Sequence, residues 1–462
     1  MKPIRLDYTH ALSEVVGEHG LSEAELSGLA EPSQRALASL QARRKKDLRW
    51  LDLPYRDEVR RSILDYAASV RGRFENVCVL GIGGSALGNT ALHSALDGPL
   101  HDVFPTRGRP RLFVLDNIDP EWIGPFLGAV DVTKTVFNVV SKSGTTAETM
   151  SQFLILRAEL VKRLGEKGQR EHIVITTDEE KGVLREIARR EGYRAFAVPD
   201  GVGGRFSVLS EVGLVSSALL GMDVEALHAG AAAMDQRCRA PALAENPALL
   251  YAALQFLLHT KHALPMSVTF AYSHRLRHVA DWYAQLLAES LGKKKARGGA
   301  TVNRGPTPVR AVGVTDQHSQ VQLYAEGPFD KWFTFLAVDE PAADVPIPGA
   351  YPDLEAVAYL GGRTLGQLFR AEREGTRIAL TDAGRPSVEI ALQRVDAHAV
   401  GQLLYLFELA VAVMGEHYDV DAFDQPGVEA GKIAAYALMG RAGYEARKAE
   451  IEARAPRRRR TV

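Results

Sequence analysis

The chain has 462 residues, and its 56 lysines and arginines almost balance 57 aspartates and glutamates, which leaves a net charge of −1 at pH 7. This balance excludes a general electrostatic attraction to nucleic acid or to a membrane surface, so we expect neither partner. The length exceeds that of a typical single hydrophobic core, and it predicts two or three domains.

The two cysteines predict no disulfide, redox pair or metal site. Cys78 lies in the apolar run 77–80, which is typical of a small buried side chain, and Cys238 lies in a polar stretch. We also expect no signal-peptide core and no apolar run of membrane-spanning length. Together these features predict a cytoplasmic protein.

Residues 1–50 are predicted to form a charged, helical N-terminal segment. Residues 51–220 are predicted to form a first α/β domain, because short apolar runs alternate there with helical stretches. This alternation favours a doubly wound parallel sheet with helices on both faces, which is a three-layer α/β/α arrangement. Its strands are predicted at 76–80, 111–115, 135–140, 172–176 and 193–198.

A second α/β domain is predicted at 264–415, after a helical connection at 221–263 that is rich in alanine and leucine. Its strands are predicted at 265–271, 310–314, 332–338 and 387–392. Residues 416–462 are predicted to form a C-terminal helical arm. The arm ends in a run of four arginines at 457–460, which we expect to be solvated.

A phosphate-binding turn is predicted where the strand at 135–140 ends. The segment Ser141-Lys142-Ser143-Gly144-Thr145-Thr146 follows this strand and precedes a helical stretch. Such a turn gathers hydroxyls, an ammonium group and free backbone N–H groups at a helix N-terminus, which suits a phosphate dianion. The segment lacks the Gly-x4-Gly-Lys-Ser/Thr spacing of a nucleotide P-loop, so we expect a sugar phosphate. An ordinary Ser or Thr N-cap is the structural alternative.

The glycine-rich turn 81–88 after the first strand supports two interpretations. It matches the Gly-x-Gly-x-x-Ala form of a dinucleotide fingerprint, and Asp116 ends the next strand as that motif requires. A nicotinamide-dependent oxidoreductase is therefore an alternative. However, Ser85 makes the turn unusually polar, and the fingerprint leaves the phosphate-type turn at 141–146 unexplained.

Two further segments carry charged side chains that suit catalysis. In Gly203-Gly204-Arg205-Phe206-Ser207, the glycines allow close approach to a ligand, and the arginine offers a fixed charge to an oxyanion or enediolate. Gln285 and Glu289 lie four residues apart near the end of an amphipathic helix, so they share one face. Apolar and small residues precede Glu289, which favours the partial burial that a general base requires. A surface salt bridge is the structural alternative for Arg205, and a capping or surface glutamate is the alternative for Glu289.

Histidines occur at two further places of interest. His318 follows a predicted strand and opens a helix, where it can act as an acid or a base. His274 and His278 have the i, i+4 spacing of metal ligands, but no glutamate lies between them, and we expect a solvent-facing basic helix.

Ligands of open parallel sheets bind beyond the carboxyl ends of the strands. That rule selects the turns 81–88, 141–146 and 315–319. It predicts that they share one cleft or line two facing clefts.

Together these segments resemble the glucose-6-phosphate isomerase (phosphoglucose isomerase) family over nearly the whole chain. The resemblance implies two sugar-isomerase (SIS) domains, each built on a doubly wound parallel sheet, and a C-terminal helical arm. It also implies a homodimer with active sites at the subunit interface, and no cofactor or metal. It rests on six segments in the family's order: 81–85, 141–149, 203–207, 285–293, 317–318 and Asp424-Gln425-Pro426-Gly427-Val428-Glu429-Ala430-Gly431-Lys432.

The resemblance further implies the reversible interconversion of glucose 6-phosphate and fructose 6-phosphate through an enediolate, in glycolysis and gluconeogenesis. Glu289 is implied to move the proton between C2 and C1, and Arg205 to stabilise the enediolate. His318, supplied by the neighbouring subunit, and Lys432 are implied to assist ring opening. The implied substrate-binding residues are Gly84, Ser85, Ser141, Lys142, Ser143, Thr146, Gln285 and Gln425.

The chain departs from the family pattern at a few positions, none of which removes a reacting group. Leu291 stands where many members have asparagine, and Pro426 and Ala430 replace bulkier residues. The residues before His318 read Thr-Asp-Gln, where Thr-Asn-Gly-Gln is the familiar form. These differences affect the fine shape of the sugar site.

Two alternative functions belong to the same fold. The first is an isomerase that also accepts mannose 6-phosphate, although Gln285, Glu289 and Lys432 favour the single-function enzyme. The second is a sugar-phosphate sensor, which binds its ligand without turnover and usually carries a DNA-binding module. Residues 1–50 do not have the pattern of such a module.

Overall fold

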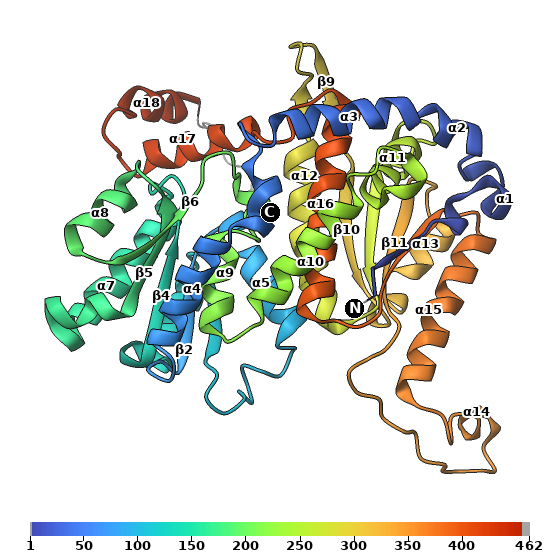
Figure 1. The fold of residues 1–462 in the computed structure, drawn as a ribbon, viewed down its shortest axis with the longest axis horizontal. Coiled ribbons are helices and arrows are strands. Elements are labelled where there is room, and N and C mark those ends of the chain that lie inside the picture. Colours follow the sequence, from blue (N-terminus) through green and yellow to red (C-terminus); the bar gives the residue numbers. More distant parts are fainter. Residues whose placement is uncertain (1, 455–462) are drawn as a thin grey trace.

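The computed structural model describes residues 2–454 and contains two five-stranded sheets with helices between and around them (Figure 1). The first sheet has the strand order β3-β2-β4-β5-β6, and all neighbouring strands in it are parallel. The predicted strands of this sheet are confirmed, with ends that agree to within two residues. They are β2 (Asn76–Leu80), β3 (Arg111–Leu115), β4 (Thr135–Val140), β5 (Ile173–Asp178) and β6 (Arg194–Val198).

Helices cover both faces of the first sheet because its strands are apolar on both sides. Val77 and Val79 face one layer, made of α4 (Asp57–Ser69), α5 (Leu87–Leu96) and α9 (Glu211–Leu219). Cys78 and Leu80 face the other layer, made of α6 (Pro120–Ala129), α7 (Ala147–Gly168) and α8 (Val183–Glu191). The expected burial of Cys78 is confirmed, and burial raises the pKa of its thiol well above the ordinary value.

The second sheet has the order β1-β12-β11-β7-β10 and is parallel except for its edge strand β1. Its other strands are β7 (Met266–Ala271), β10 (Thr307–Val312), β11 (Lys331–Val338) and β12 (Ser387–Leu392). The strand predicted at 310–314 therefore begins three residues earlier than expected. Pro308 lies inside β10, which is tolerated because β10 is an edge strand.

The prediction that residues 1–50 are helical is wrong at β1 (Arg5–Asp7), which pairs antiparallel with β12. Three residues are too few to show a strand period, and the pairing is supplied by tertiary structure. The rest of the segment is mainly helical, and its α-helices are α1 (Ser13–Val16), α2 (Glu23–Gly28) and α3 (Ala30–Arg43).

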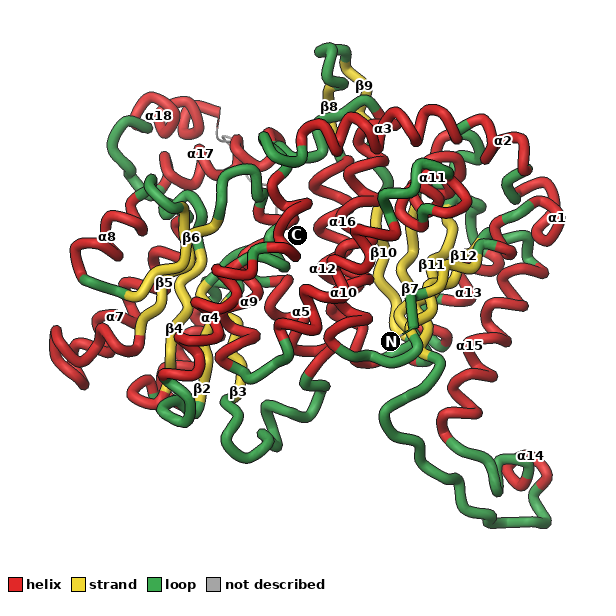
Figure 2. Tube along the Cα trace, viewed as in Figure 1, coloured by secondary structure: helices red, strands yellow, loops and turns green. Residues whose placement is uncertain are grey.

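Helices also cover both faces of the second sheet, so the doubly wound α/β fold is confirmed. Phe270 and Phe333 pack with α13 (Val321–Glu326) and α15 (Leu365–Asp382). On the other face lie α11 (Pro247–Thr260), α12 (Arg277–Leu291) and α16 (Ala397–Tyr418). Figure 2 shows α10 (Val224–Arg237), α12 and α16 between the two sheets.

Two features of the second half were not predicted. A hairpin of β8 (Lys293–Lys295) and β9 (Thr301–Arg304) follows α12. A long excursion, residues 339–364, leaves the body between β11 and α15 and carries the short helix α14 (Glu355–Ala358) (Figure 1).

The helix α16 forms the centre of the protein. By length and hydropathy it could span a membrane, so the expectation that no apolar run reaches that length is wrong. Its most apolar 18-residue window is 94% buried inside the protein, as in the core helix of a folded domain. An added Cβ at Gly401 would lie 2.0 Å from the carbonyl oxygen of Leu227, so this glycine allows α10 to cross α16 closely.

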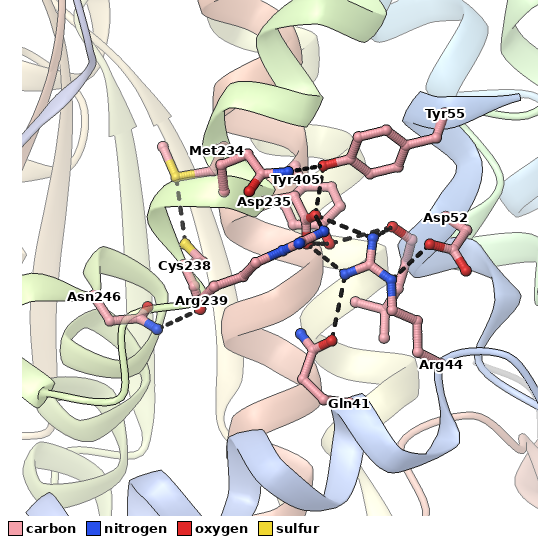
Figure 3. Close-up of polar contacts among 12 residues, drawn as sticks. Gln41, Arg44, Asp52, Tyr55, Met234, Asp235, Cys238, Arg239, Asn246 and Tyr405 are labelled. Atoms are coloured by element: carbon pink, nitrogen blue, oxygen red, sulfur yellow. Dashed lines mark hydrogen bonds and ion pairs between the residues drawn. The ribbon is translucent and has the colours of Figure 1, made fainter. Parts of the chain in front are cut away.

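A buried polar cluster joins the N-terminal segment to this core (Figure 3). The carboxylate of Asp235 on α10 accepts hydrogen bonds from the Arg44 guanidinium at 2.8 and 3.0 Å, and from the hydroxyls of Tyr55 and Tyr405 at 2.6 Å each. Burial acts to raise the pKa of Asp235, but these hydrogen bonds outweigh it and lower the pKa below its ordinary value. The cluster thus fixes α3 and the turn after it against α10 and α16.

The C-terminal arm returns to the first sheet. After α16 the chain forms a short 3-10 turn (Pro426–Val428), α17 (Glu429–Leu438) and α18 (Glu445–Arg454), which lie near β6 and α8 (Figure 1). The arginine run at 457–460 lies outside the described residues, and the predicted domain boundaries stay predictions.

Candidate active site

Turns at the carboxyl edge of the first sheet enclose a cavity of about 630 Å³, which the C-terminal arm also borders. The turns after β2, β4, β5 and β6 all contribute, as the strand-end rule requires. Seven of the predicted site residues line the cavity: Ser85, Ser141, Lys142, Ser143, Thr146, Gln425 and Lys432.

The predicted phosphate turn has the geometry of an anion site. Thr146 occupies the N-cap of α7, yet among the described residues its side chain makes no capping hydrogen bond. Instead the Ser141 hydroxyl lies 3.1 Å from the Thr146 hydroxyl and accepts a 3.1 Å hydrogen bond from the Gly144 N–H. The N-terminal N–H groups of α7 are therefore left to a ligand rather than to a side-chain cap, which favours an anion.

Gly144 is required for this turn. Its φ is +64°, and an added Cβ would lie 2.6 Å from the backbone nitrogen of Leu184. Lys142 ties the turn to the segment after β6, because its ammonium donates to the carbonyls of Val202 at 3.0 Å and Pro199 at 3.4 Å. An ammonium has three protons, so one is left to face an anion in the cavity.

Two glycine turns meet beside the cavity. An added Cβ at Gly84 would lie 2.3 Å from the carbonyl oxygen of Gly204, so the turns after β2 and β6 touch through their backbones. The turn 81–88 is thus packed against a second turn of the same chain. This contact explains Gly84, whereas an added Cβ at Gly81 would lie 2.8 Å from the Ser85 carbonyl oxygen and Gly83 has a φ of +56°. The contact also places Arg205, the residue after Gly204, beside the turn 81–88.

Arg205 is the centre of the charged part of the site. Its side chain is only 4% exposed, and its Nη1 lies 3.0 Å from Oε2 of Glu289 and 3.0 Å from Oε1 of Gln425. Its Nε donates to the Ser290 hydroxyl at 2.9 Å, and its Nη2 donates to the carbonyl of Ala422 at 2.8 Å. Burial lowers the pKa of Arg205 from its ordinary value, while the Glu289 carboxylate acts in the opposite direction.

Glu289 and Gln285 lie on one face of α12, as their spacing predicts. The Gln285 amide donates to Oε2 of Glu289 at 3.4 Å, and it lies 2.9 Å from the point where a Cβ on Gly83 would be. The Glu289 side chain is 26% exposed, so it is partly buried, as expected. Gln285 and Glu289 do not line the cavity themselves, whereas Gln425 does. Arg205 contacts both Gln425 and Glu289, and so connects Glu289 to the cavity wall.

His318 lies far from Glu289 within one chain. Val314, four residues before it, lines a different cavity together with His274, which precedes α12. From Arg277 at the start of α12 to Glu289 near its end, the helix rises about 18 Å at 1.5 Å per residue. The turn 315–319 therefore does not share the cavity of the other two predicted turns.

Lys432 is placed at the cavity by α17 of the arm. Its side chain is half exposed, and its ammonium donates to the Glu429 carboxylate at 2.9 Å. The chain thus brings 11 of the 12 predicted site residues to one region and leaves His318 apart.

Sequence reasoning missed several residues of this region. Asp178 at the end of β5 and Lys181 and Gly182 in the turn after it line the cavity, and an added Cβ at Gly182 would lie 2.7 Å from the Ser143 carbonyl. The strand-end rule could have selected this turn, since a strand was predicted just before it. Lys293 was also missed. Its buried ammonium donates to the Glu289 carbonyl at 3.1 Å and to the Asp424 carboxylate at 2.8 Å.

His274 and His278, the two histidines with metal-ligand spacing, have different surroundings. The ring of His278 is hydrogen-bonded to Asp281 at 2.6 Å, while His274 is exposed. Within residues 2–454, no group of three or more His, Cys, Asp or Glu side chains is arranged to hold a metal ion.

Comparisons with known proteins identify relatives of the whole chain. The sequence pattern of the family described as phosphoglucose isomerase matches residues 60–337 and 369–453. A glucose-6-phosphate isomerase from Carboxydothermus hydrogenoformans is 45% identical over 452 residues, which are 97% of each chain.

Solved structures are similar as well. A hypothetical protein from Thermus thermophilus is 41% identical with a TM-score of 0.83, over 95% of this chain and 100% of that one. A glucose-6-phosphate isomerase from Chlamydia trachomatis is 26% identical with a TM-score of 0.74, over 86% of this chain and 76% of that one. The chain belongs to the phosphoglucose isomerase family.

Proposed function

We propose that the protein interconverts glucose 6-phosphate and fructose 6-phosphate, as a glucose-6-phosphate isomerase. The observation that carries the proposal is the contact of the Glu289 carboxylate with the buried Arg205, beside a cavity lined by the hydroxyls of the 141–146 turn. An aldose–ketose exchange needs a base for the carbon acid and a cation for the developing oxyanion, and this pair supplies both.

Different residues act on the two ends of the substrate: one group binds the phosphate, and another carries out the proton transfer. The turn 141–146 at the N-terminus of α7 holds the phosphate, which fixes the position of the reacting carbons. Glu289 takes the proton from C2 of the open-chain aldose and returns it to C1, while the proton of the C2 hydroxyl passes to the oxygen on C1. Arg205 stabilises the negative charge that develops on the enediolate oxygens, and Gln425 keeps the guanidinium in place.

Ring opening precedes this proton transfer and requires an acid near the ring oxygen. Lys432, which lines the cavity, is one donor in the proposal. The other is His318 of a second subunit, because the same chain holds His318 at the opposite end of α12 from Glu289. We therefore propose a homodimer with shared active sites. The proposal extends to a cytoplasmic enzyme of glycolysis and gluconeogenesis that has no nucleic-acid or membrane partner.

A coupled assay tests the reaction directly. Purified protein is given fructose 6-phosphate, and glucose 6-phosphate is measured with its dehydrogenase, with EDTA present. We expect sustained turnover. Binding of fructose 6-phosphate without turnover would instead indicate the sensor.

The two remaining alternatives have tests of their own. Tight binding of a nicotinamide cofactor, with an absorbance change on addition of substrate, would indicate the oxidoreductase. Comparable turnover on mannose 6-phosphate would contradict a single-function enzyme.

A further inference from the structure

Lys293 is a buried cation at the end of the helix that carries the proposed base. It is the first residue of β8 and follows Gly292, the C-cap of α12. Its side chain is only 5% exposed, whereas Lys294 and Lys295, the next two residues of the same strand, are exposed. Because lysine is almost never fully buried unless its charge is paired, the contacts of Lys293 distinguish it from its two neighbours.

The Lys293 ammonium donates to three acceptors. They are the Glu289 carbonyl at 3.1 Å, the Asp424 carboxylate at 2.8 Å and the Asp424 backbone carbonyl. An ammonium group has three protons, so all three are used within the chain and none is left for a ligand. Lys293 also does not line the cavity, whereas Lys432 does. Its influence on the reaction therefore passes through the residues that it holds.

The contact with the Glu289 carbonyl fixes the end of α12. The last carbonyl groups of a helix lack donors from the helix itself, and a lysine side chain can supply one. Lys293 does so for a carbonyl in the last turn of α12. Because this carbonyl belongs to the proposed base, the hydrogen bond restrains the backbone from which the Glu289 carboxylate extends.

The two contacts with Asp424 fix the start of the C-terminal arm. The next residue, Gln425, lines the cavity and contacts the Arg205 guanidinium at 3.0 Å. Arg205 also donates to the Asp424 carbonyl, at 3.1 Å, so this carbonyl accepts from both cations. Beyond Gln425, α17 carries Lys432 to the cavity.

We infer that Lys293 is a positioning residue that couples the end of α12 to the C-terminal arm. It thereby holds the proposed base, Glu289, in place relative to Gln425 and Lys432. The inference rests on the proposed function, because it concerns the alignment of those groups and adds no reacting group. The turn 141–146 lies at the start of another helix, α7, so binding of the sugar phosphate depends less on Lys293 than turnover does.

Two variants and a matched control test the inference. Lys293→Met removes the ammonium group and keeps an unbranched side chain of similar length. Asp424→Ala removes the carboxylate that faces it, and because the Asp424 side chain is 52% exposed, this variant should fold even if Lys293→Met does not. Lys294→Met is the control, since it makes the same change at an exposed position of the same strand. Urea unfolding identifies the variants that are folded.

Steady-state kinetics with fructose 6-phosphate measure the alignment. We expect Lys293→Met to lower kcat by about 10- to 100-fold with a much smaller change in KM, because a displacement of about 1 Å at a catalytic group can cost about 100-fold in rate. The control should have the kcat of the wild type. A kcat for Lys293→Met equal to that of the control, or a rise in KM alone, would contradict the inference.

A double-mutant cycle tests whether Lys293 acts through the arm. We expect Asp424→Ala to lower kcat as well, and the double variant to be no slower than the slower single variant, because both substitutions remove one link. Effects that multiply in the double variant would show that the two residues act independently. Either that result or a normal kcat in Asp424→Ala would overturn the coupling.

Hydrogen–deuterium exchange tests the same coupling without catalysis. We expect the amides of α17 to exchange several-fold faster in Lys293→Met than in the control, while those of α7 are unchanged. If the wild type has no isomerase activity, the proposed function fails, and the exchange of α17 still tests the link. If α17 exchanges equally in Lys293→Met and in the control, Lys293 does not hold the arm, and the inference fails while the proposed function stands.

Discussion

The buried Arg205 and the partly buried Glu289 form an ion pair across two structural units, with Nη1 and Oε2 separated by 3.0 Å. Arg205 follows the last strand of the first sheet, whereas Glu289 lies near the end of a helix that covers the second sheet. The same guanidinium holds the C-terminal arm through Gln425 and Ala422. One side chain therefore connects the proposed general base to the arm that carries Lys432, and its own guanidinium is the proposed oxyanion-stabilising charge.

We expect Arg205→Lys to lower kcat by about 100-fold with a smaller change in KM. Lysine keeps the positive charge, but it cannot reach Glu289, Ser290 and Gln425 together as the guanidinium fork does. The loss of one well-placed donor to a developing oxyanion costs about 10²–10³ in kcat. Steady-state kinetics with Arg61→Lys, an exposed arginine, as the control measure the effect. A rise in KM alone would show that Arg205 binds the ground state and not the enediolate.

Gly84→Ala is expected to disrupt the site because the added Cβ would lie 2.3 Å from the Gly204 carbonyl oxygen. The two turns must separate, which displaces Arg205, and a displacement of about 1 Å at a catalytic group can cost about 100-fold in rate. Gly203→Ala is the matched control, since no atom lies within 4 Å of its added Cβ and its φ is −76°. Equal kcat/KM values for the two variants would argue against the backbone contact.

Asp235→Asn should destabilise the protein by about 3–5 kcal/mol, as expected when one partner of a buried ion pair is removed. The change removes the buried one of the two carboxylates that pair with Arg44, leaving only the more exposed Asp52, and it weakens the hydrogen bonds from Tyr55 and Tyr405. Urea unfolding measures the effect, and Asp57→Asn, an exposed carboxylate paired with Arg60, is the control. A loss no larger than that of the control would mean that the cluster in Figure 3 adds little to stability.

His93 predicts a pH-dependent contribution to stability. Burial acts to lower its pKa, but hydrogen bonds with Asp102 and Asp97 outweigh it and raise the pKa of His93 to about 9. A raised pKa means that the folded state holds the proton more tightly, so this stability is complete below the ordinary value near 6.5. It declines as the pH rises towards 9 and is absent above it.

The shift corresponds to roughly 3 kcal/mol. We therefore expect His93→Gln to lower the free energy of unfolding by several times more at pH 6 than at pH 10. Urea unfolding at both pH values measures this. An equal loss at both would mean that the side chain acts by packing and not by its charge.

The sequence was sufficient to predict most of the parallel strands and the turn 141–146 between β4 and α7. Their signals are local. In the segment 135–164, an apolar run, a group of hydroxyl residues and a helical stretch follow one another, and this order predicts strand, turn and helix without information from the rest of the chain. β1 could not be predicted, because its three residues become a strand only by pairing with β12. The predicted start of β10 was three residues too late. Proline disfavours a strand unless the strand lies at a sheet edge, and the sequence alone does not show that Pro308 lies in an edge strand.

The site was predictable in its parts but not in its assembly. Nothing local brings Arg205 next to Glu289, which lies 84 residues later, and only the resemblance to the family placed them together. The contacts of Lys293 with Asp424 and of Gly84 with Gly204 depend on how whole units pack. A periodic pattern describes one element at a time and does not report such contacts.

The substitution Glu289→Gln tests the central claim most directly. It keeps the shape of the side chain and removes the base, so fructose 6-phosphate should still bind while isomerisation falls by about 10²–10⁴-fold or more. The coupled assay measures turnover, and calorimetric titration with fructose 6-phosphate measures binding, both against the wild type. We expect a dissociation constant within a few fold of the wild type together with the loss of turnover. Normal turnover in this variant would contradict the assignment of Glu289 as the base, and with it the proposed mechanism.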